Sequence, residues 1–161
     1  MTLSVGDRIP DATLFVPGES GPEARSTHDI FAGRKIVLVG MPGAFTPTCH
    51  RNHLPGFIEN RDVILEKGAD EIAVLTTNDT HVMRAWAETT GAKDRITFLS
   101  DGNGEFVRKA GLDYENHARG MGTRSRRFAA IVDDGVVTAI SVEDVPGQAI
   151  SSSAARILEQ L

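Results

Sequence analysis

The stretch IVLVGMPGAFTPTCH, residues 36–50, decides how the rest of this sequence is interpreted. It opens with a continuous apolar run, Ile36 to Gly40, which is typical of a central strand covered on both faces. A loop rich in proline and glycine follows and ends on Cys49, the only cysteine in the chain. A loop that leaves a central strand and opens a helix is where open α/β sheets usually carry their chemistry. Cys49 is therefore the first candidate for a reactive side chain.

The residues after this loop predict a helix with Cys49 in its first turn. Thr46 is a good N-cap, and Pro47 suits the first helical position. Unpaired backbone N–H groups and the positive end of the helix would then face the sulfur, and such surroundings favour the reactive thiolate. Pro55 lies inside the same helix, so we expect a kink or a split after the first two turns. A lone cysteine is also compatible with a small buried hydrophobe, but the combination of strand, proline loop and cap favours a nucleophile.

The remaining pattern alternates strands and helices, which is an α/β order. Right-handed crossovers would make the early strands parallel. We expect the following elements: a strand at 12–16, a turn at 17–22, a short helix at 26–31, strands at 71–75 and 96–99, helices from 78–79 to about 90 and at 105–110, a hairpin of 127–132 with 136–142, and a last helix at 151–161. We expect a single domain over residues 1–161.

Composition limits the partners and the compartment. The chain has 17 basic and 22 acidic residues, a net charge of −5, which argues against nucleic acid as a main partner. No apolar run reaches the roughly 18 residues of a membrane span, and the first residues lack the layout of a secretory signal. A single cysteine fits a reducing compartment, so the sequence predicts a cytoplasmic protein.

A family resemblance rests on the segment PGAFTPTC, residues 42–49, which matches the Pro-x-x-x-Thr-x-x-Cys signature of the peroxiredoxins. The sequence onward to Phe57 resembles their atypical, type II (peroxiredoxin-5-like) branch, and the segments 77–86 and 124–128 agree with it. The resemblance extends from about residue 3 to residue 161. It implies a thioredoxin-like fold with a central mixed β-sheet flanked by helices. It also implies a thiol-dependent peroxidase that reduces hydrogen peroxide and organic hydroperoxides.

The same resemblance assigns roles in the loop. Cys49 would be the peroxidatic nucleophile, whose thiolate attacks the peroxide and becomes a sulfenic acid. Thr46 would hydrogen-bond the peroxide and the sulfur, and Pro42 would shield the sulfur from water. The implied reaction needs a hydroperoxide as substrate and no cofactor.

An arginine that stabilises the thiolate and the polarised O–O bond is also implied, and the motif match places it at Arg124. A guanidinium is a fixed, always charged multiple donor, which suits this task. Strand alternation would put Arg124 and Arg126 on one side and Arg127 on the other. Residue type and spacing alone do not indicate which of the three arginines has this role.

His53 lies four residues after Cys49 and therefore on the same face of a helix. It either tunes the thiol or packs as a structural histidine, and a subunit contact is a further possibility. The nearby His50 invites a metal interpretation, but a zinc site needs three or four ligands and the other histidines have no supporting spacing, so we expect no metal. Phe45 is a core candidate, and the resemblance suggests that it lies near a homodimer contact.

The second, resolving cysteine of many peroxiredoxins has no counterpart here. The positions that resemble its usual places hold Val74 and, approximately, Ser151. We therefore expect a one-cysteine mechanism in which an external thiol reduces the Cys49 sulfenic acid. Glutathione with glutaredoxin and thioredoxin are the candidate reductants.

Three other functions compete for the same cysteine. A thiol–disulfide oxidoreductase would need Cys-x-x-Cys, whereas Thr46 and Asn52 stand at the partner positions. A Cys–His hydrolase, with His53 or a distant histidine as base, would turn over esters or amides without peroxide. A non-enzymatic redox sensor would share the site but react slowly with peroxide and show no turnover.

Overall fold

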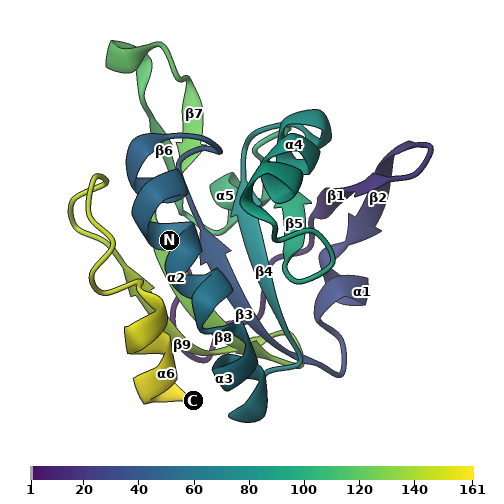
Figure 1. Cartoon of the computed structure of the whole chain (residues 1–161), viewed down its shortest axis with the longest axis vertical. Helices are drawn as coiled ribbons and strands as arrows, with labels where there is room; N and C mark the ends of the chain where they lie inside the picture. Colours follow the sequence, from purple (N-terminus) through teal and green to yellow (C-terminus); the bar gives the residue numbers. More distant parts are fainter. Residues whose placement is uncertain (1) are drawn as a thin grey trace.

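The computed structural model describes residues 2–161, which form a central twisted sheet with helices on both of its faces (Figure 1). In chain order the elements are β1 (Thr13–Gly18), β2 (Gly21–Ser26), α1 (Thr27–Phe31), β3 (Lys35–Gly40), the π-helix η1 (Cys49–His53), α2 (Leu54–Glu59), α3 (Arg61–Glu66), β4 (Glu71–Thr76), α4 (Thr80–Thr90), β5 (Thr97–Ser100), α5 (Glu105–Lys109), β6 (Asp113–Glu115), the 3-10 helix η2 (His117–Arg119), β7 (Thr123–Ser125), β8 (Phe128–Asp133), β9 (Val136–Val142) and α6 (Ala154–Gln160).

The main sheet has the strand order β2-β1-β5-β4-β3-β8-β9. β3 pairs parallel with β4, and β4 pairs parallel with β5, which confirms the expectation of parallel early strands. β8 pairs antiparallel with β3 and with β9, so the sheet is mixed. Because β3 lies inside the sheet and ends at Gly40, the loop that carries Cys49 leaves the middle of the sheet.

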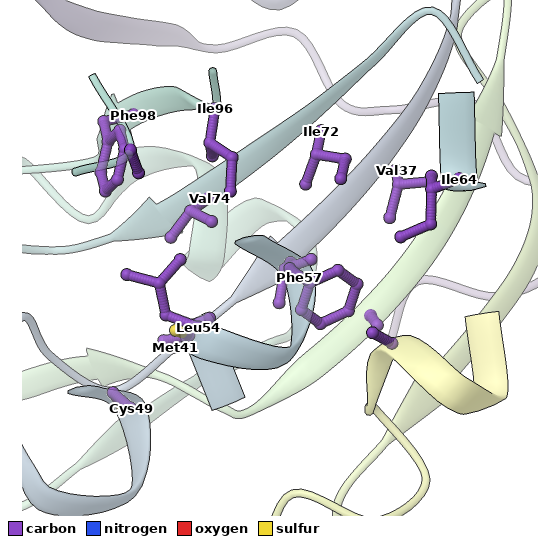
Figure 2. Packing of buried hydrophobic residues seen from close by; sticks show 14 of the residues in the cluster. Val37, Met41, Cys49, Leu54, Phe57, Ile64, Ile72, Val74, Ile96 and Phe98 are labelled. Carbon is purple, nitrogen blue, oxygen red and sulfur yellow. The ribbon is translucent and has the colours of Figure 1, made fainter. Parts of the chain in front are cut away.

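Both faces of the central strands are buried, as their continuous apolar runs predict. Val37 and Val39 of β3 belong to a cluster packed beneath α2, α3, α4 and α6, whereas Ile36 and Leu38 point to the opposite face, toward α1 and α5. Figure 2 shows the first of these clusters, with Cys49 on the helical segment at one end of it. The loop that carries Cys49 is thus anchored on a packed layer rather than on a free surface.

Two elements differ from the sequence-based expectation. Residues 17–22 are not a turn throughout, because β1 continues to Gly18 and β2 begins at Gly21. β2 is a mostly exposed edge strand without apolar alternation, and an edge position tolerates Pro22. The short pair β6 and β7 was also not predicted, since three-residue strands leave no periodic signal.

The helix after the loop is irregular where Pro55 predicts a disturbance. Helical residues begin at Pro47, as expected, and the segment Cys49–His53 is a π-helix. The N–H of Leu54 donates to the carbonyl of Cys49, five residues back. Proline has no N–H with which to continue the ordinary pattern, and wide π-turns are frequent at functional sites. A second interruption, at Asn60, separates α2 from α3.

Across residues 2–161, every helix is too short or too polar to span a bilayer.

Candidate active site

Cys49 lies in the first turn of the helical segment that follows β3, and its side chain is fully buried. The N–H of His50 donates to the carbonyl of Thr46 at 2.8 Å, which makes Thr46 the residue that receives the first helical hydrogen bond. The predicted placement of the cysteine at a helix start is therefore confirmed. Its burial means that the sulfur meets protein donors rather than bulk water.

Arg127 is the arginine that contacts the sulfur. Its Nη2 lies 3.2 Å from Sγ of Cys49, and the side chain is buried. Two further bonds fix the guanidinium: Nε donates to the carbonyl of Pro146 at 3.0 Å, and Nη1 lies 3.1 Å from Nδ1 of His53. A buried, always charged donor held on three sides is suited to stabilise negative charge on the sulfur.

The motif match selected Arg124 for this contact, and the structure corrects that choice. Arg124 Nη1 donates to the carbonyl of Pro42 at 3.3 Å, and Nε donates to that of Met121 at 2.8 Å. The alternation argument fails because residues 126 and 127 belong to no strand: β7 ends at Ser125, and β8 starts a new pairing at Phe128. Arg124 therefore holds the loop, whereas Arg127 reaches the sulfur.

His53 connects Arg127 to the opposite wall of the site. Its Nε2 lies 2.8 Å from the carbonyl of Ser152, which can only accept, and its Nδ1 faces Arg127, which can only donate. These partners define a neutral imidazole with the proton on Nε2. Burial, with the Arg127 charge acting in the same direction, lowers the pKa of His53 from its usual 6.5 to about 4. His53 is thus linked to the Cys49 sulfur through Arg127.

The loop residues that precede the helix are held from several directions. The Thr46 hydroxyl donates to the carbonyl of Gly43 at 2.6 Å, and the N–H of Ala44 donates to the side chain of Asn78 at 2.8 Å. Pro42 is buried. Because the Thr46 proton is committed to Gly43, the free lone pairs of its oxygen are left to accept a hydrogen bond from an incoming O–H group.

Phe45 is exposed rather than part of the core, with 45% of its surface accessible. Its backbone has a φ of 63°, an uncommon conformation for an aromatic residue and one that costs energy. The ring stacks on His50 with centroids 5.5 Å apart, and His50 Nδ1 in turn accepts a hydrogen bond from Nε1 of the buried Trp86 at 2.9 Å. The rim of the site is therefore aromatic.

Glu143 and Ser152 belong to the site's surroundings although no sequence signal singles them out. Both are buried, and the Glu143 carboxylate accepts hydrogen bonds from the backbone and hydroxyl of Ser152. They lie roughly a hundred residues after Cys49 in the sequence, so only the fold brings them to the site. Within residues 2–161, no three histidine, cysteine or acidic side chains are grouped so that they could hold a metal ion.

Comparison with known proteins identifies the family. Residues 4–158 match the Redoxin family. The chain is 46% identical to peroxiredoxin-2E-2 of Oryza sativa subsp. japonica, with 99% of this chain and 73% of that protein covered, and 42% identical to peroxiredoxin-2B of Arabidopsis thaliana, with 99% and 98% covered. The chain belongs to the peroxiredoxins. The reduced Prx3 of Vibrio vulnificus, solved in complex with hydrogen peroxide, superposes with a TM-score of 0.93 at 40% identity, with 99% of both chains covered.

These similarities confirm several expectations made from the sequence. The chain is a type II, one-cysteine peroxiredoxin with a thioredoxin-like fold. It is a thiol-dependent peroxidase, an oxidoreductase that acts on hydroperoxides with thiol reductants. In this peroxiredoxin, the only cysteine is buried in the first turn of the helical segment after β3 and lies 3.2 Å from Nη2 of Arg127.

Proposed function

We propose that Cys49 is the peroxidatic nucleophile and that Arg127, Thr46 and Pro42 form the rest of its catalytic site. The observation that carries the proposal is the 3.2 Å contact between Nη2 of Arg127 and Sγ of the only cysteine. The thiolate attacks the terminal oxygen of a hydroperoxide, and the S–O bond forms as the O–O bond breaks. The leaving alkoxide or hydroxide takes up a proton, so one alcohol or water molecule and one sulfenic acid result.

Each neighbour has a separate task in this step. Arg127 stabilises the thiolate and then the charge that develops on the peroxide oxygens. Thr46 accepts a hydrogen bond from the peroxide O–H and so orients it toward the sulfur. Pro42 presents an apolar, donor-free wall, and Arg124 keeps the Pro42 carbonyl in place through its 3.3 Å hydrogen bond.

The sulfenic acid is reduced by an external thiol, because the chain contains no second cysteine. The first thiol displaces water and forms a mixed disulfide with Cys49. A second thiol then releases the cysteine and leaves with the first as a disulfide. Glutathione with glutaredoxin and thioredoxin remain the candidate reductants.

A homodimer is proposed on the basis of Phe45. A large aromatic side chain that is 45% exposed beside the reactive cysteine is the kind of residue that protein interfaces bury. A cytoplasmic location is likewise proposed, although relatives include the chloroplastic peroxiredoxin-2E-2 and the mitochondrial peroxiredoxin-2F. One sheet carries both buried clusters, which supports a single domain over residues 1–161.

A steady-state peroxidase assay with a panel of reductants tests the proposed cycle. We expect turnover of hydrogen peroxide with glutathione and glutaredoxin or with thioredoxin, and none in Cys49→Ser. Mass spectrometry under non-reducing conditions should find a sulfenic acid or a mixed disulfide on Cys49. An obligatory disulfide-linked homodimer during turnover would contradict the external reductant, and peroxide consumption by Cys49→Ser would contradict the nucleophile.

A further inference from the structure

Glu143 is a buried carboxylate that organises one turn of the chain. Its Oε2 accepts hydrogen bonds from the N–H of Ile150 at 2.7 Å, from the N–H of Ser152 at 2.7 Å and from the Ser152 hydroxyl at 2.5 Å. Burial alone would raise its pKa, but these hydrogen bonds outweigh burial and the pKa of Glu143 is lowered. Glu143 is therefore ionised at neutral pH, and its negative charge strengthens the hydrogen bonds that hold residues 150–152.

The turn that Glu143 holds is connected to the Cys49 sulfur by a chain of hydrogen bonds. The carbonyl of Ser152 accepts the Nε2 proton of His53, and Nδ1 of His53 accepts from Nη1 of Arg127. Nη2 of the same guanidinium contacts Sγ of Cys49. Each link has one possible direction, because a carbonyl only accepts and a guanidinium only donates. A displaced Ser152 carbonyl would release the imidazole, and a released imidazole would free one side of the guanidinium.

The backbone of the same segment also holds Arg127 and the start of the helix. The N–H of Glu143 donates to the carbonyl of Arg127 at 2.9 Å. The Pro146 carbonyl accepts from Nε of Arg127, and the Gly147 carbonyl accepts from the Thr48 hydroxyl at 2.9 Å. Residues 143–152 thus contact the active site at several points. The Glu143 side chain, at the start of this segment, is hydrogen-bonded to Ile150 and Ser152 at its end.

We propose that Glu143 is a positioning residue of the peroxidase site, which holds the turn 150–152 so that Ser152 and His53 aim the Arg127 guanidinium at the Cys49 sulfur. The proposal rests on the proposed roles of Cys49 and Arg127. Glu143 itself touches neither sulfur nor peroxide. Its contribution is preorganisation, since a donor that is already in place needs no rearrangement when charge develops on the reacting atoms.

The test measures the second-order rate constant for hydrogen peroxide with the pre-reduced full-length chain, followed by Trp86 fluorescence in a stopped-flow instrument. Mutation of a residue that orients an active-site group without touching the reacting atoms typically lowers activity roughly tenfold to a hundredfold. We expect Glu143→Ala to lower the rate constant by that factor. Glu143→Gln keeps an acceptor oxygen of the same reach and should recover most of the loss.

The matched control is Glu71→Ala. Glu71 is a partly buried carboxylate that accepts hydrogen bonds from two side chains, Arg34 at 2.7 Å and Thr97 at 2.5 Å, but it lies at the start of β4, away from the Cys49 loop. Its loss should leave the peroxide rate constant unchanged even where stability falls. Equal effects of Glu71→Ala and Glu143→Ala would overturn the proposal.

A double-mutant cycle separates positioning from general damage. If Glu143 acts through Arg127, Glu143→Ala should slow the wild-type enzyme but add no further loss to Arg127→Gln. Additive losses would overturn the proposal while leaving the proposed function intact, whereas a normal rate in Arg127→Gln would contradict the proposed function itself. If Glu143→Ala fails to fold, Ser152→Ala can replace it, because this variant removes one of the three groups that donate to Glu143. We expect Ser152→Ala to lower the peroxide rate constant several-fold in the wild-type background and not to lower it further in the Arg127→Gln background.

Discussion

Nη2 of Arg127 lies 3.2 Å from Sγ of Cys49, although 78 residues separate the two in the sequence. The distance is short because β8 pairs with β3, so the residue that precedes β8 reaches the loop that follows β3. Sheet pairing therefore delivers a buried positive charge to the one thiol of the chain. The contact also distinguishes Arg127 from Arg124, which holds the loop instead.

Arg127→Gln should lower the rate constant for hydrogen peroxide by about 10² to 10³-fold, the usual loss when one preorganised donor is removed from a developing charge. The fold should survive, since glutamine retains part of the hydrogen bonding. Arg124→Gln is the matched comparison and should cost less, because Arg124 contacts the carbonyls of Pro42 and Met121 and not the sulfur. Stopped-flow fluorescence on both variants checks the ranking, and a larger loss in Arg124→Gln would reverse the assignment.

The part of this site that consists of neighbouring residues in the loop after β3 could be predicted from the sequence. Thr46, Pro47 and Cys49 are neighbours, so strand, loop and helix start follow from composition and capping preferences. The choice of arginine could not be made in the same way. It depends on where β7 ends and β8 begins, and a two-residue interruption between them breaks the alternation that would relate Arg124 to Arg127. The role proposed for Glu143 cannot be predicted from the sequence for the same reason. Its hydrogen bonds to the turn 150–152 become relevant only when the fold places that turn beside the helical segment that carries Cys49 and His53.

Thr46→Val should slow the reaction with peroxide by about a hundredfold, whereas Thr46→Ser should stay close to the wild type. Valine matches the shape of threonine but has no oxygen to accept a hydrogen bond from the peroxide. Serine keeps that oxygen and can keep the bond to the Gly43 carbonyl, which is 2.6 Å in the wild type. Peroxide rate constants of the two variants provide the measurement. Equal rates in Thr46→Val and Thr46→Ser would show that the hydroxyl has no part in the chemistry.

Gly40→Ala should destabilise the fold strongly at the point where the reactive loop begins. A Cβ at Gly40 would lie 2.0 Å from Cε1 and 2.4 Å from Cδ1 of Phe128, its partner across the β3–β8 pair, so it would clash with one edge of the ring. Overpacking of this kind costs about 3 kcal/mol. Phe128→Leu shortens the ring side chain, so the double variant Gly40→Ala with Phe128→Leu should lose less than the sum of the two single losses. Denaturant unfolding measures all four proteins, and strict additivity would mean that the ring is not the obstacle.

The pH dependence of stability should carry the signature of His53. In the unfolded chain this histidine has its usual pKa of 6.5, whereas burial lowers the pKa to about 4 in the folded chain. Between these values the unfolded chain binds a proton that the folded chain does not. The free energy of unfolding is therefore complete above pH 6.5, decreases as the pH falls toward about 4 and levels off below that. The full decrease from this one group is about 3 kcal/mol.

His53→Gln isolates that contribution, because glutamine offers an acceptor for Arg127 and a donor for the Ser152 carbonyl but does not titrate. We expect urea unfolding of the wild type and His53→Gln to give curves of stability against pH that run parallel above pH 6.5. They should converge or cross as the pH falls, since only the wild type loses stability by protonating position 53. The carboxylates titrate in both proteins and cancel in the difference. Curves that stay parallel down to about pH 4 would mean that His53 binds its proton in the folded chain as readily as in the unfolded one.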